Sequence, residues 1–75
     1  MNLKQFIKSH WKNYNDCANE LGVSYRTIVN YVHNNPTGIL KHTAVVTKKE
    51  NVEPLTLFDA VACTMEEKNE NRAAV

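Results

Sequence analysis

The first apolar positions of the chain follow the three- and four-residue spacing of an amphipathic helix. Asn2 precedes them and carries a side chain suited to a helix N-cap. The positions that recur at this spacing are Leu3, Phe6, Ile7, His10 and Trp11. The pattern predicts a helix that begins after Asn2. Its opposite side carries a row of lysines that forms either a solvated face or a phosphate-contacting face, namely Lys4, Lys8 and Lys12.

Residues 14–33 have the residue sizes and the spacing of a helix-turn-helix. Ala18 is small at the position where two such helices approach most closely. Four residues later, Gly22 suits a backbone that leaves the first helix with positive φ. Ser24 can then cap the second helix through its hydroxyl. The apolar positions expected to face inward are Cys17, Leu21, Val23, Ile28 and either Tyr31 or Val32.

Cap and turn residues set the expected bounds of these two helices. Either Asn13 or Asn15 caps the first helix, which runs to Leu21. The second helix follows Ser24 and ends near residues 34–38, which have strong helix-breaking chemistry. The N-terminal part of the chain is therefore expected to hold three helices.

The segment after this unit favours a strand. Residues 39–47 are rich in β-branched side chains, and the densest part lies at 43–47. Pro54 would limit any returning strand to a short or edge position. We therefore expect a short β-strand or extended segment near 43–47.

Helical spacing returns in the last third of the chain. The repeating apolar positions are Leu55, Phe58, Val61, Ala62 and Met65. Thr56 and Asp59 have the form of a capping box at the start of such a helix. We expect a helix over about 56–68, followed by a frayed tail over 69–75, where the sequence is polar and then small. The predicted fold is mainly α.

Seventy-five residues make one domain of marginal stability, which self-association would help. No apolar run reaches the roughly 18 residues that cross a bilayer, and the N-terminus lacks the apolar core of a signal peptide. The chain is therefore expected in the cytoplasm. Cys17 and Cys63 are then expected to be reduced and to act as small hydrophobic residues.

The sequence holds no pattern of a catalytic or ligand-binding site. It has no glycine-rich phosphate loop, no nucleophile at a recognisable spacing from a base and no cysteine-histidine spacing of a zinc site. Its histidines are isolated from one another, and His10 is expected on a helix surface. We therefore expect no enzyme activity, no cofactor, no metal and no small-molecule ligand.

Charge divides the chain more sharply than its net value of +1 suggests. Residues 1–49 carry seven lysine and arginine side chains against two acidic ones, whereas residues 50–75 carry two against six. The basic half contains the helix-turn-helix, as a surface that faces phosphates requires. Double-stranded DNA is therefore the expected partner, and the acidic half should face away from it.

The outward face of the second helix of this motif carries candidates for reading bases. In a helix-turn-helix the N-terminal part of that helix enters the major groove. Arg26 can donate a bidentate pair to guanine, Asn30 can pair with adenine, and Val29 can touch a thymine methyl group. The full set of base-reading candidates is Tyr25, Arg26, Val29, Asn30 and His33.

A second set is expected to hold the DNA backbone. It combines cations with hydroxyl groups and with the amides that open the first helix of the motif. The candidates are Lys12, Tyr14, Asn15, Ser24, Thr27, Lys41 and His42.

The order and spacing of residues between Leu3 and His42 resemble those of the small Cro-type repressors of lambdoid phages. The matching segments are Leu3-Lys4-Gln5-Phe6, Cys17-Ala18-Asn19-Glu20-Leu21-Gly22-Val23, and Ile28-Val29-Asn30 with His33. The resemblance implies a homodimer, in the cytoplasm of a bacterial host, that binds a short pseudo-palindromic operator and represses a nearby promoter. It implies base-reading and backbone-contacting roles for Ser24, Tyr25, Arg26, Val29, Asn30 and His33.

These predictions divide the single domain into a DNA-binding unit (1–42), a dimerisation segment (43–68) and a tail (69–75). The residues expected at the dimer contact are Val45, Leu55, Phe58, Val61 and Met65. One alternative is that their stripe folds back on the first helix of the same chain, and another is that two chains pair along the strand expected at 43–47. Two other functions stay open: a protein-interaction module, such as an antirepressor or an RNA-polymerase modulator, and an accessory protein of recombination or replication.

Overall fold

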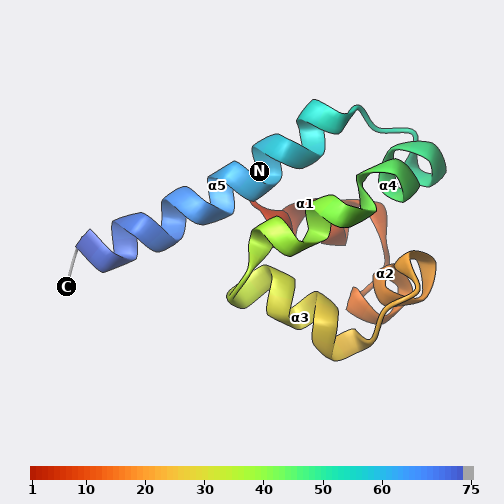
Figure 1. Cartoon of the computed structure of the whole chain (residues 1–75), viewed down its shortest axis with the longest axis horizontal. Helices are drawn as coiled ribbons and strands as arrows, with labels where there is room; N and C mark the ends of the chain where they lie inside the picture. Colours follow the sequence, from red (N-terminus) through yellow and green to blue (C-terminus); the bar gives the residue numbers. More distant parts are fainter. Residues whose placement is uncertain (74–75) are drawn as a thin grey trace.

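Helices make up most of the chain, whose computed structural model describes the backbone of residues 1–73 and the side chains of residues 1–68 (Figure 1). In chain order they are α1 (Leu3–His10), α2 (Tyr14–Leu21), α3 (Tyr25–His33), the 3-10 helix η1 (Pro36–His42), α4 (Thr43–Glu50) and α5 (Pro54–Ala73). No strand occurs within residues 1–73. The mainly α fold is confirmed, and the expected strand is not found.

Side-chain caps begin the first two helices. The side chain of Asn2 accepts a hydrogen bond from the backbone N–H of Gln5 at 2.9 Å, and the Gln5 side chain accepts one from the N–H of Asn2. This reciprocal pair is a capping box. Asn13, rather than Asn15, caps α2 by accepting a hydrogen bond from the N–H of Asp16. The predicted start of α1 is confirmed.

The connection between α2 and α3 has the turn that its sequence predicts. Gly22 ends α2 with φ of 73°, in the left-handed region that glycine adopts without steric cost. Ser24 then caps α3 by accepting a hydrogen bond from the N–H of Thr27 at 3.2 Å. Ala18 is buried on α2, which packs directly against α3. The two helices and the tight turn between them are confirmed.

The core forms where α5 crosses α1 and η1, and where η1 lies against α3. Its largest fully buried side chains are Leu3, Phe6, Ile7, Cys17, Ile28, Ile39, Val46 and Leu57. Gly38 allows the close approach of η1 to α3, because a side chain there would begin 2.5 Å from the ring of Tyr31. The turn expected over 34–38 is shorter than predicted, because η1 begins within it at Pro36.

Residues 43–47, expected as a strand, form the first part of α4 instead. Val46 is fully buried in the common core, and α4 packs against both η1 and α5. A strand must hydrogen-bond to a neighbour, and the segment that returns from Pro54 is a helix. The burial of Val46 between helices therefore outweighs the modest strand preference of β-branched residues.

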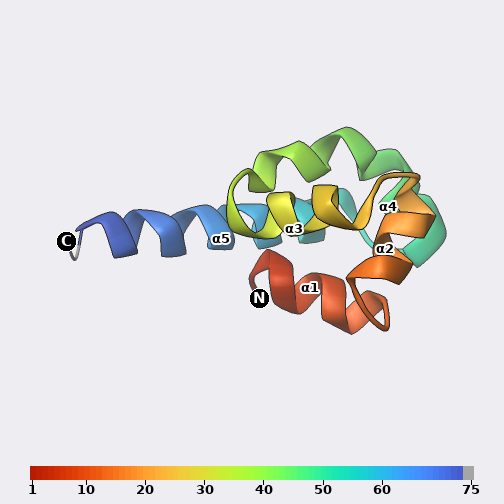
Figure 2. The ribbon, with the colours of Figure 1, turned by 90° about the horizontal axis from the view of Figure 1, so that it is seen from below.

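The last helix, α5, extends in both directions beyond the helix expected over 56–68. It begins at Pro54, whose fixed φ and missing N–H suit a first helical position. Thr56 therefore lies inside the helix, and the predicted capping box is wrong. The helix continues to Ala73, where a frayed tail was expected, and only residues 74–75 lie outside the described part. Its C-terminal half extends past the other helices (Figures 1 and 2).

Candidate nucleic-acid interface

The five side chains predicted to read bases lie together on the outward side of α3. The inward side is fixed by Ile28, Tyr31 and Val32, which are buried. The outward side chains are Tyr25, Arg26, Asn30 and His33, which are exposed, and Val29, which is half-buried. The combination of an aromatic, an aliphatic, a cationic and an amide side chain offers the donors and apolar surface that base edges in the major groove require.

Hydrogen bonds to the cap residues of α3 involve three of the predicted contacts, Asn30, Ser24 and Thr27. The side-chain amide of Asn34 donates to Oδ1 of Asn30 at 3.0 Å, which orients Asn30 and leaves its own amide nitrogen as a donor. The hydroxyls of Ser24 and Thr27 lie 2.9 Å apart at the start of α3. The hydroxyl of Ser24 caps α3, and Ser24 is exposed at the start of that helix.

A groove of about 480 Å³ lies beside this face of α3. We call it the α1–α3 groove, because α1 and α3 run along it in opposite directions (Figure 2). Its lining residues are Lys4 and Lys8 of α1, Lys12 and Asn13 in the connection to α2, Tyr14 and Asn15 at the start of α2, and Tyr25 and His33 of α3. The groove thus brings together three predicted backbone contacts and two predicted base contacts.

Two tyrosines meet in the α1–α3 groove. The ring centroids of Tyr14 and Tyr25 are 6.3 Å apart, with the ring planes tilted by 45°. Burial, and to a smaller extent the neighbouring Tyr25, raises the pKa of the Tyr14 phenol above its ordinary value. Tyr14 therefore stays protonated at neutral pH and can donate a hydrogen bond to an anionic ligand.

Four of the predicted backbone contacts do not line the groove, namely Ser24, Thr27, Lys41 and His42. Lys41 is exposed near the end of η1. Nε2 of His42, which is half-buried, lies 3.3 Å from the hydroxyl of Tyr31. Burial, followed by the charge of Lys41, lowers the pKa of His42, so its ring is neutral at neutral pH. His42 thus supplies no positive charge there.

Sequence reasoning left three lining residues of the groove unassigned. Lys4 and Lys8 were open between a solvated face and a phosphate-contacting face, and Asn13 was considered only as a cap. The four-residue spacing of the lysines was the available signal. It places them on one side of α1, and only the packing of α1 beside α3 turns that side toward a groove.

The residues predicted at a dimer contact are divided by the fold. Leu55, Phe58 and Met65 are exposed on α5, at 65%, 42% and 43%. Val61 is buried in the core of its own chain, so its assignment to a dimer contact is wrong. Val45 on α4 is half-buried against the same core. Part of the predicted stripe therefore folds back on the chain, and the rest stays uncovered.

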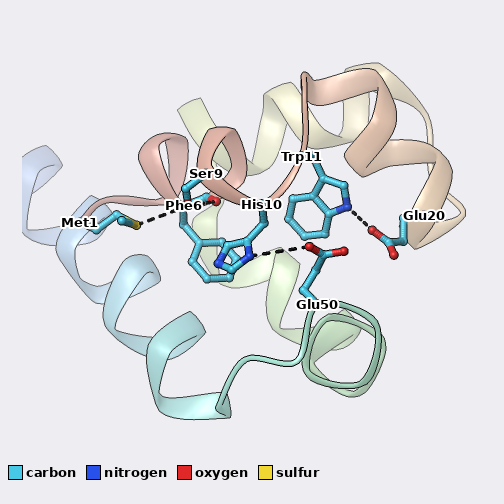
Figure 3. A network of polar contacts seen from close by, with 7 residues as sticks. All are labelled: Met1, Phe6, Ser9, His10, Trp11, Glu20 and Glu50. Atoms are coloured by element: carbon cyan, nitrogen blue, oxygen red, sulfur yellow. Dashed lines mark hydrogen bonds and ion pairs between the residues drawn. The ribbon is translucent and has the colours of Figure 1, made fainter.

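A polar cluster joins the ends of α1, α2 and α4 (Figure 3). The indole N–H of Trp11 donates to the carboxylate of Glu20. Nδ1 of His10 lies 3.7 Å from the carboxylate of Glu50. Burial, and then the neighbouring Glu20, raises the pKa of Glu50, whereas His10 opposes that shift. His10 is therefore half-buried beside Glu50, whereas a position on the helix surface was expected.

Cys17 lies near this cluster in the core. Burial raises the pKa of its thiol to about 12, and Glu20 and Glu50 act in the same direction. The thiol is thus protonated at neutral pH and a poor nucleophile, as its expected role of small hydrophobic residue requires. Cys63, expected in the same role, is only half-buried. Within the described side chains, no three His, Cys, Asp or Glu residues are arranged to hold a metal ion.

Comparisons of the chain with protein families, with curated proteins and with solved structures gave no match. The resemblance to Cro-type repressors therefore remains a prediction from the residues between Leu3 and His42. In the part of the chain that the structure describes, no helix has the length and apolar character to cross a membrane.

Proposed function

We propose that this chain is a sequence-specific DNA-binding protein that inserts α3 into the major groove of double-stranded DNA. One observation carries the proposal: the exposed face of α3 borders the α1–α3 groove, whose lining holds three lysines and no acidic side chain. A DNA reader needs both features side by side, because base edges give sequence preference while neutralised phosphates give most of the affinity.

Arg26 and Asn30 are the residues that we propose for direct readout. Both are exposed on α3 and neither lines the α1–α3 groove. The guanidinium of Arg26 matches the O6 and N7 acceptors of guanine, and the oriented amide of Asn30 matches N6 and N7 of adenine. Val29 lies on the same face and offers a methyl contact to thymine.

A second copy of the chain is the partner that we propose for the uncovered side of α5. Its exposed side chains Leu55, Phe58, Ala62 and Met65 follow the three-four-three spacing of a helix-helix seam. Twofold pairing would set two α3 helices about 34 Å apart, one turn of DNA. Such a dimer would bind a short pseudo-palindromic operator and repress an overlapping promoter, the activity that the Cro-type resemblance implies.

Selection of bound duplexes from a random DNA pool tests this function. We expect the recovered sites to share a pseudo-palindrome whose half-sites lie about 10 base pairs apart, centre to centre. A pool that stays random after several rounds would contradict sequence-specific binding. That result would favour the protein-interaction function, which uses the same fold without base readout.

Phe58→Asp tests the dimer. We expect this variant to stay folded and to sediment as a monomer, because Phe58 is exposed and a charge there disrupts only the seam. Operator affinity should fall about a hundredfold, since the second half-site loses its effective concentration. Thr56→Asp is the control, because Thr56 is exposed on α5 outside the seam. A Phe58→Asp variant that still sediments as a dimer would place the contact elsewhere.

A further inference from the structure

The α1–α3 groove has two ends with distinct linings. At one end Lys4 and His33 lie together, since both also line a smaller cavity of about 150 Å³ that adjoins the start of α1. The first turn of α2 and Tyr25, which begins α3, line the same groove as Lys12. The groove follows most of the length of both helices, because its lining includes Lys4 and Lys8 of α1 and the first and last residues of α3, Tyr25 and His33.

The lysines on α1 and just after it form a row of like charges without compensation. Lys4 and Lys8 are four residues apart, which sets them about 6 Å apart on one side of α1, and Lys12 follows the end of α1 and lines the same groove. Helix α1 contains no acidic residue, and among the described side chains no carboxylate forms an ion pair with these lysines. Like charges at this spacing disfavour a helix. A row with no internal counterion therefore suits an extended anionic ligand. The row consists of Lys4, Lys8 and Lys12.

The start of this row is held in place by α5. The backbone N–H of Leu3 donates to the hydroxyl of Thr64 at 2.8 Å, in a buried hydrogen bond. The side-chain amide of Asn2 donates to the Glu67 carboxylate at 3.1 and 3.2 Å. Glu67 is thereby bonded at the end of the groove, where it lines the smaller cavity with Lys4. These hydrogen bonds fix the start of α1 on α5 before any ligand binds.

We infer that the α1–α3 groove seats the sugar-phosphate backbone of one DNA strand, the strand that borders the major groove into which α3 inserts. The inference rests on the proposed function. Lys4, Lys8 and Lys12 neutralise successive phosphates of that strand, whose charges repeat regularly along its length. The protonated Tyr14 phenol adds a hydrogen bond to a phosphate oxygen.

This placement divides the outward face of α3 into two edges. Tyr25 and His33 line the groove, so they contact the backbone of the seated strand. Arg26 and Asn30 are exposed but do not line it, so they are left for base edges. Tyr25 and His33, which the sequence assigned to base reading, therefore position the protein on the DNA backbone instead.

Salt dependence of binding tests the seat. The probe is a duplex recovered by selection from the random pool, and the variants are Lys4→Gln, Lys8→Gln and Lys12→Gln. Each should flatten the slope of log affinity against log salt by about 0.9 per bound subunit, because one phosphate in each half-site loses its cation. Preference for the selected duplex over a scrambled one should stay unchanged, since backbone contacts carry no sequence information.

Matched controls come from Lys48→Gln and Lys49→Gln, which remove the same charge from exposed positions in the last turn of α4, outside the groove. We expect wild-type slopes for both. If the three groove variants have the same salt slope as the two control variants and sequence preference is retained, the proposed backbone contact in the groove is overturned. The proposed function would still stand. Wild-type protein without any sequence preference would instead overturn the proposed function.

Uncharged methylphosphonate linkages in the duplex locate the seated strand. If Lys8 neutralises a given phosphate, replacing that phosphate should weaken wild-type binding and leave Lys8→Gln binding unchanged. Within each half-site, the sensitive phosphates for Lys4, Lys8 and Lys12 should follow one another along one strand. Sensitivity scattered over both strands of a half-site, or additive losses at every position, would contradict the proposed placement.

Discussion

The region from α1 to α3 and the region from α4 to α5 are both helical, but different forces define their boundaries. In the first region each helix begins with a side-chain cap, Asn2, Asn13 or Ser24, that is visible in the sequence. In the second, α4 has no side-chain cap at its start, and its buried contact is a single valine, Val46. Local chemistry therefore specifies the first region, whereas packing against the rest of the molecule specifies the second.

The largest expected effect tests whether packing holds the second region. Leu57 is fully buried on α5, so Leu57→Ala should lower the free energy of unfolding by about 2 to 5 kcal/mol. Leu55→Ala is the control, because it makes the same change at a side chain that is 65% exposed. Denaturant unfolding at monomeric concentrations measures both. Similar losses in the two variants would mean that α5 does not pack on the core through Leu57.

A smaller effect tests whether caps hold the first region. Ser24→Ala removes the oxygen that accepts from the N–H of Thr27, and it should lower the free energy of unfolding by about 1 kcal/mol. Ser24→Asp keeps an acceptor at the same position and should unfold like the wild type. Thermal or denaturant unfolding checks the pair. A Ser24→Asp variant as unstable as Ser24→Ala would show that the hydroxyl matters for another reason.

This difference also explains which parts of the fold the sequence predicts. Gly22 and the three caps act within a few residues, so their spacing is enough to place α1, α2 and the turn before α3. The strand expected at 43–47 was wrong, because a high content of β-branched residues does not determine the secondary structure of a segment that packs among helices. Val61 was misassigned because a repeat of apolar positions does not show which members face the core.

The candidate site is predictable to a similar extent. The outward face of α3 follows from helical spacing once Ile28 and Val32 are assigned inward. The α1–α3 groove does not follow, because it depends on the angle and distance at which α1 lies beside α3. Lys4 and Lys8 therefore have no assigned role until the two helices are placed together in space.

The smallest effect concerns the polar cluster that joins the two regions. Burial and Glu20 raise the pKa of Glu50 in the folded chain above its ordinary value of 4.5. The folded state therefore keeps the proton to higher pH than the unfolded state does. The stabilisation that the protonated Glu50 side chain gives the folded state is complete below about pH 4.5. It is lost as the pH rises through the folded-state pKa of Glu50.

Glu50→Gln should remove this part of the pH dependence. Unfolding experiments at pH 4.5 and pH 7 compare the free energy of unfolding of the variant with that of the wild type. The difference in favour of the variant should be larger at pH 7. Glu53→Gln removes an exposed carboxylate three residues away and is the control. Parallel pH profiles for wild type and Glu50→Gln would show that Glu50 does not titrate differently on folding.

The most direct test of the central claim is a binding competition between a selected duplex and random DNA, with Arg26→Ala, Asn30→Ala and the control Lys48→Ala. If the outward face of α3 reads bases, each of the first two variants should lose about 1 to 3 kcal/mol on the selected duplex and relax preference at one base pair. Random DNA should be affected less. Equal losses on the two DNAs would contradict base readout by α3.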